Sequence, residues 1–120
     1  MANQYYFTIY EDGSTGWAFM ENQPVLSQPG TFVTYAEYSQ AYLINREAEY
    51  QRILDSLEAD VTRTSQVRDA YVTMGVPLAT ANIMSGYTGA VTSRDQHIAD
   101  HDSFVTVRPS ADQVEAGVPA

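Results

Sequence analysis

The sequence contains no cysteine, so its fold cannot depend on disulfide bonds or on thiolate metal ligands. It also contains no apolar run near the roughly 20 residues that a transmembrane helix needs, so we expect no membrane partner. The first residues, Met1-Ala-Asn-Gln, lack the basic and apolar regions of a secretion signal. These absences predict a cytosolic protein, or one that joins a particle assembled in the cytosol.

Lysine is absent as well. All basic residues are arginines, and the 6 of them face 15 acidic residues, which gives a net charge of -9. Because a chain with this charge repels polyanions, we expect no direct binding to DNA or RNA. The acidity leaves one alternative function, an acidic inhibitor of a nucleic-acid-binding host enzyme. The carboxylates are spread along the chain with arginines among them, which argues against that alternative.

Glycine and proline are both missing from Thr31 to Met74. At the front of this stretch Thr34 and Glu37 have the spacing of a capping box, which predicts a helix start. At its end Gly75 and Pro77 predict a helix stop. We therefore expect a helical region over residues 35–85. Polar residues at 58–66 favour a break there and a helical hairpin, because one helix of about 40 residues is far above the usual length. A single long helix is the alternative if copies associate.

Residues 4–21 predict a β-hairpin. The first strand, Gln4–Tyr10, is rich in aromatic and β-branched residues, and a Gly-containing turn separates it from a second strand at residues 17–21. Alternation places Trp17 and Phe19 on one face, which we expect to be the buried face of the hairpin. A hairpin alone is marginally stable in water, so we expect it to lie on the helix or on another chain.

The rest of the chain predicts smaller elements. Residues 76–86 predict a short helix that ends at Gly86, and a capping-box pattern at 93–96 predicts a charged helix over 94–102. Residues 104–108 predict a strand. Together these expectations define an α+β fold: an N-terminal β-hairpin, a long helix or helical hairpin, a short helix and an extended C-terminal segment. We expect a single domain over residues 1–108 and a mobile tail over 109–120 unless a partner orders it.

Nine tyrosines are an unusual number for 120 residues. Tyrosine offers a rigid face and one polar tip, which suits surfaces that become half buried against a partner. The alternative is that they are ordinary strand and core-edge residues. We predict a partner interface, with homo-oligomerisation, at six aromatic residues: Trp17, Phe19, Tyr35, Tyr38, Tyr42 and Tyr50.

Few residues suggest chemistry. If their segment is helical, His97 and His101 share a face at the spacing of a two-histidine metal site, and Asp100 could add an oxygen ligand. However, no glutamate follows the first histidine and no third ligand is indicated, so a metal-binding protein is only a further alternative. No nucleophile elbow or phosphate-binding loop is present. We therefore predict no catalytic residue, no metal and no cofactor, and a protein that is not an enzyme.

The N-terminal half resembles the front of tail-fibre assembly proteins of tailed bacteriophages. The likeness rests on the aromatic hairpin, the loop at 24–30 and the helix start Thr34-Tyr-Ala-Glu-Tyr38. Residues 68–76, followed by Ala81 and Gly86, resemble the helix end of small virion-associated proteins. The resemblance implies a structural or assembly protein of a phage virion, tail or fibre. Such a protein acts through contacts with other structural proteins of the particle, in the virion and during its assembly in the host cytoplasm.

Overall fold

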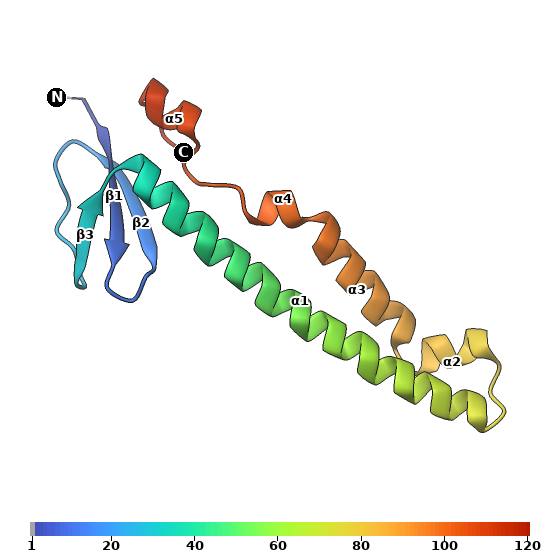
Figure 1. Cartoon of the computed structure of the whole chain (residues 1–120). Helices are drawn as coiled ribbons and strands as arrows, with labels where there is room; N and C mark the ends of the chain where they lie inside the picture. Colours follow the sequence, from blue (N-terminus) through green and yellow to red (C-terminus); the bar gives the residue numbers. More distant parts are fainter. Residues whose placement is uncertain (1) are drawn as a thin grey trace. The chain divides into compact units, whose positions relative to one another are not determined.

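The computed structural model describes residues 2–120 and has an α+β fold, which confirms the predicted class. In chain order the elements are β1 (Gln4–Tyr10), β2 (Thr15–Met20), β3 (Gly30–Val33), α1 (Tyr35–Thr73), α2 (Leu78–Met84), α3 (Tyr87–Ala99), α4 (His101–Phe104) and α5 (Ala111–Ala116) (Figure 1). They pack into two compact units. The sheet unit comprises residues up to 48 together with 105–120, and the helical unit comprises residues 49–104. Helix α1 contributes residues to both.

The sheet is antiparallel, in the order β2-β1-β3. The predicted hairpin is confirmed, because Phe7 pairs with Trp17 and Tyr5 pairs with Phe19, which places these four rings on one face. Strand β3, which pairs with β1 from Phe7 opposite Val33 to Tyr10 opposite Gly30, was not predicted. Four residues are too few to show the alternation that marks a strand in sequence.

The start of α1 packs on the sheet through aromatic rings. The Phe7 ring lies 4.8 Å from the Tyr38 ring and 5.3 Å from the Tyr35 ring, measured between centroids. The C-terminal segment joins this core at Pro109, which is fully buried. The Tyr38 hydroxyl donates a hydrogen bond to the Arg108 carbonyl, and the Tyr35 hydroxyl donates one of 3.2 Å to the Pro109 carbonyl. Three segments of the sheet unit therefore meet at one pair of tyrosines.

The segment expected to be an extended tail contains α5. Ser110 caps this helix by accepting a hydrogen bond of 3.3 Å from the Gln113 amide, and the Gln113 side chain accepts one of 2.9 Å from the Ser110 amide. This reciprocal pair is a capping box. Beyond α5 the Val118 carbonyl accepts a hydrogen bond from the Tyr5 hydroxyl. The end of the chain is therefore tied to β1 within the sheet unit.

Helix α1 is a single uninterrupted helix of 39 residues, so the predicted break at 58–66 is wrong. The hydroxyls in that stretch bond back to the helix, since Thr64 Oγ1 donates to the Asp60 carbonyl at 2.7 Å and Ser65 Oγ donates to the Thr62 carbonyl at 2.7 Å. Thr64 is also only 4% exposed. The polar residues are thus satisfied within the helix, and they do not require a turn.

The predicted ends of α1 are confirmed. At its start the Glu37 amide donates to Thr34 Oγ1 at 3.2 Å, and Glu37 Oε1 accepts from the Thr34 amide at 3.4 Å. At its end Gly75 has φ of 94°, and the Gly75 and Val76 amides bond to the carbonyls of Val72 and Tyr71 at 3.0 Å each. This pattern is a Schellman motif, which satisfies carbonyls that would otherwise be unpaired.

In the helical unit α3 runs antiparallel to the second half of α1. At one end the Arg68 guanidinium lies 4.3 Å from the centroid of the Tyr87 ring, and at the other His97 stacks on Tyr50. Helix α3 begins at Tyr87 after Gly86 in the left-handed conformation, so the helix start predicted near residue 93 is wrong. The strand predicted for 104–108 is also wrong, because Phe104 ends α4 and lies 5.9 Å from the Tyr50 ring.

Replacing Thr34 with alanine removes the hydroxyl that caps α1. We expect Thr34→Ala to lower the free energy of unfolding by about 1 kcal/mol, the usual cost of losing such a cap. Chemical denaturation followed by circular dichroism measures the change. Ser56→Ala is the matched control, since Ser56 is exposed in the interior of α1 and alanine favours a helix interior. An equal loss in both variants would contradict the assigned cap.

Candidate interaction site at the α1–α2 corner

Five of the six residues predicted as a partner interface come together in the sheet unit. They form an aromatic cluster with Tyr5 and Phe7 that has Tyr38 at its centre. The Tyr38 ring lies 6.2 Å from the Tyr35 ring and 5.9 Å from the Tyr42 ring, and Tyr38 itself is only 1% exposed. Phe19 is half-buried, with its ring 4.6 Å from that of Tyr5. While the chain holds this conformation, the Tyr38 ring is unavailable to a partner.

The sixth residue, Tyr50, belongs to the helical unit and is 8% exposed. Its ring lies 4.4 Å from the His97 ring in a stacked arrangement and 4.6 Å from the His101 ring edge-on. The chain's own residues therefore occupy both the face and the edge of Tyr50. Trp17 is the most exposed of the six, at 38%.

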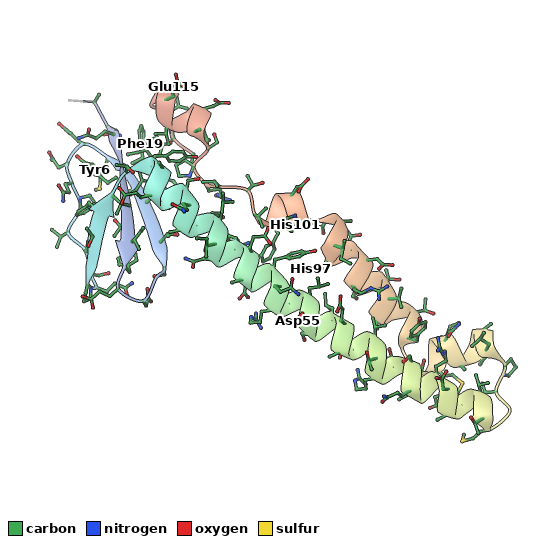
Figure 2. All side chains as sticks on the ribbon, in the orientation of Figure 1. Tyr6, Phe19, Asp55, His97, His101 and Glu115 are labelled. Carbon is green, nitrogen blue, oxygen red and sulfur yellow. The ribbon has the colours of Figure 1, made fainter. Side chains whose placement is uncertain are left out.

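The two histidines serve this packing. Figure 2 shows both on the side of α3 and α4 that faces α1. His97 Nε2 lies 3.1 Å from the Tyr50 carbonyl oxygen, and since a carbonyl only accepts, Nε2 carries the proton. His101 Nδ1 lies 3.4 Å from Asp102 Oδ1. Within residues 2–120 no group of three or more His, Cys, Asp or Glu side chains is arranged to hold a metal ion.

The helical unit also contains a long run without charge, which was not among the predicted sites. From Ala70 to Ser93 the sequence has no acidic residue, no basic residue and no histidine, although the whole chain carries a net charge of -9. This run covers the end of α1, the connection at 74–77, α2 and the first half of α3. The signal is present in the sequence as a lack of charge, which neither apolar periodicity nor ligand spacing reveals.

The same run exposes large apolar side chains. We call these five the corner surface, and their exposed fractions are 42% for Val72, 72% for Met74, 58% for Leu78, 75% for Ile83 and 54% for Met84. Val72 belongs to the end of α1, Met74 lies in the connection at 74–77, and the other three belong to α2. Apolar groups this exposed gain free energy when a second surface removes them from water.

On α2 the small Ala81 is the buried residue, and the larger apolar side chains are exposed. Ala81 is completely buried, and a Cβ on Gly86 would lie 3.8 Å from Thr64 Cγ2. At 100° per residue, Ile83 lies on the far side of α2 from Ala81. The burial of Ala81 therefore leaves Ile83 on the exposed side of α2.

This surface has the composition of an interface core. The fully buried parts of protein interfaces are depleted of charge and enriched in methionine, which adapts its shape to a partner. Exposed apolar groups gathered in one place mark interaction sites more often than scattered ones do. Among residues 2–120, no helix combines the length and apolar character needed to cross a membrane. The exposed and uncharged corner surface is thus the candidate interaction site of the helical unit.

Comparison with known proteins adds no relative, because no family model, curated protein or solved structure matches the chain.

Burial raises the pKa of the Tyr38 hydroxyl from its usual 10 to about 12, and the neighbouring Tyr42 and Tyr35 add to the shift. A raised pKa means that the folded state keeps this proton while the unfolded state releases it. The stabilisation is therefore complete below pH 10 and is lost as the pH rises from 10 to about 12.

We expect the free energy of unfolding of the wild-type chain to fall across that window. Tyr38→Phe should lower stability at pH 7 by about 1 kcal/mol through loss of the hydrogen bond to Arg108. Its decline between pH 10 and 12 should be shallower than that of the wild type. Urea denaturation at a series of alkaline pH values tests both points, and parallel declines in the two proteins would contradict the assigned shift.

Proposed function

We propose that this chain is a non-enzymatic structural or assembly protein that acts through protein–protein contacts made by the corner surface. The observation that carries the proposal is the exposure of Met74, Leu78 and Ile83 at 58% or more within an uncharged run of a strongly acidic chain. Charges elsewhere keep such a chain soluble, while the run from Ala70 to Ser93 presents no carboxylate that a partner would have to desolvate.

The construction of the helical unit supports the same role. The Schellman motif at Gly75 fixes the end of α1, and Thr64 of α1 and Ala81 of α2 are both buried. A surface that is already ordered loses little conformational entropy when it binds. The corner surface is thus suited to repeated contacts of one geometry, as a structural component needs.

The resemblance to small tailed-phage proteins suggests the partners and the location. The partners are other structural proteins of a phage particle, and the chain acts in the virion or during its assembly in the host cytoplasm. Quantitative mass spectrometry of purified particles tests it. A permanent component is expected at a fixed ratio to the other structural proteins, and its absence from both particles and assembly intermediates would contradict the phage assignment.

A charge placed on the corner surface should block the contact. Ile83→Glu puts a carboxylate on a side chain that is 75% exposed, so the fold should remain intact while the partner would have to bury an unpaired charge. We expect binding to weaken by at least about tenfold. The measurement is co-sedimentation of the tagged chain with assemblies from cells that carry its gene.

Val25→Glu is the matched control. Val25 is 97% exposed and lies in the sheet unit, so it has the same chemistry as Ile83 without belonging to the corner surface. Circular dichroism should show that both variants stay folded. Equal co-sedimentation of both variants and the wild type would exclude the corner surface as the contact site.

A further inference from the structure

Strand β2 forms one edge of the sheet, and its sequence does nothing to protect that edge. The order β2-β1-β3 leaves β2 with a neighbour on one side only. The strand reads Thr15-Gly-Trp-Ala-Phe-Met20 and contains no charge and no proline. Proteins that must stay unpaired usually place lysine, proline or a bulge at such an edge. β2 carries none of these and can therefore pair with another strand.

The hydrogen bonds show which β2 groups point outward. The Tyr10 amide donates to the Ser14 carbonyl at 2.9 Å, and the Glu11 amide donates to the Pro29 carbonyl at 3.1 Å. Hydrogen-bonded and non-hydrogen-bonded pairs alternate along an antiparallel ladder. Even-numbered residues of β1 therefore bond to β2, and odd-numbered ones bond to β3.

The register then assigns every residue of β2. Gly16, Ala18 and Met20 lie opposite even-numbered residues of β1 and use their backbone groups there. Thr15 and Phe19, with Trp17 between them, direct both N–H and C=O away from β1. No group within residues 2–120 forms a hydrogen bond with these outward amides and carbonyls. Trp17 is also 38% exposed beside them.

We propose that this edge binds β2 of a second copy of the chain, antiparallel, about a two-fold axis at Trp17. A two-fold axis in an antiparallel pair makes one residue face itself, and Trp17 is the middle of the three outward residues. Trp17 then pairs with Trp17 of the second copy, while Thr15 and Phe19 pair with each other across the axis. Every outward backbone group of β2 gains a partner.

The symmetry of the outward residues about Trp17 and the lack of charge on β2 favour a second copy as the occupant. In this register the paired span runs from Ser14 to Met20, and it contains no charged residue. No carboxylate faces another carboxylate, although each chain carries a net charge of -9. Like charges placed directly opposite one another would destabilise the pair, so this neutral span can pair with its own copy. The exposed indoles of the two copies meet at the axis and cover each other.

This dimer is independent of the proposed function, because β2 lies in the sheet unit and the corner surface lies in the helical unit. Its test uses the self-facing position. W17E and W17R each place like charges opposite one another, so each alone should dimerise at least about tenfold more weakly than the wild type. A mixture of the two places opposite charges together and should restore a heterodimer. Sedimentation velocity and native mass spectrometry measure both effects.

Met20 provides the matched control. It is 39% exposed on the same strand but lies opposite Ser14 in the proposed register. M20E and M20R should therefore show no mutual rescue on mixing. A wild-type chain that stays monomeric up to about 1 mM would overturn the proposal. So would failure of the W17E and W17R mixture to associate, with both variants folded by circular dichroism. Loss of the dimer in I83E with full dimerisation of W17E would assign the contact to the corner surface instead.

The absence of cysteine permits a second, covalent test of the register. W17C places one thiol opposite its own copy, where the Cα atoms of a hydrogen-bonded pair lie about 5.5 Å apart, within the range of a disulfide. Mild oxidation should give a disulfide-linked dimer. T15C on the same face of β2 does not face itself and should cross-link much less. Equal cross-linking at both positions would exclude an axis at Trp17.

Discussion

The sheet unit depends on the burial of one tyrosine. Tyr38 packs its ring against Phe7 of β1 and donates its hydroxyl to the Arg108 carbonyl, so a single side chain joins the sheet, the start of α1 and the C-terminal segment. Its apolar ring and polar tip satisfy two different neighbours at once. Because so few side chains of this small unit are fully buried, that contact carries a large share of its cohesion.

The helical unit is packed differently, and its packing determines which apolar side chains remain exposed. At one end Tyr50 is covered by His97 and His101, and at the other the small Ala81 of α2 is completely buried. Since Ala81 makes the buried contact, the larger Ile83 is left in solvent. An apolar surface is thus produced by ordinary close packing, in the part of the chain that has no charge. This coincidence of exposure and neutrality supports the proposed role in protein contacts.

The misreadings of the sequence share one physical origin. The local pattern at 58–66 predicts a break, yet Thr64 is buried and its hydroxyl bonds back to the helix. The local pattern does not predict β3, which forms because β1 provides hydrogen-bonding partners for it. The six aromatic residues were predicted to form a partner interface, and this stays a prediction, although five of them pack together in the sheet unit. Their position inside the chain could not be read from spacing, because a stripe looks the same whether its cover is the same chain or another one.

Local chemistry is what the sequence by itself determined. The capping box at Thr34 and Glu37, the stop at Gly75 and the alternation of the hairpin depend on residues a few positions apart, whose geometry is nearly independent of the rest. Only the tertiary structure decided which apolar residues are covered, because burial depends on contacts between residues distant in sequence. It therefore placed Tyr38 and Tyr50 inside and left Ile83 and the edge of β2 in solvent.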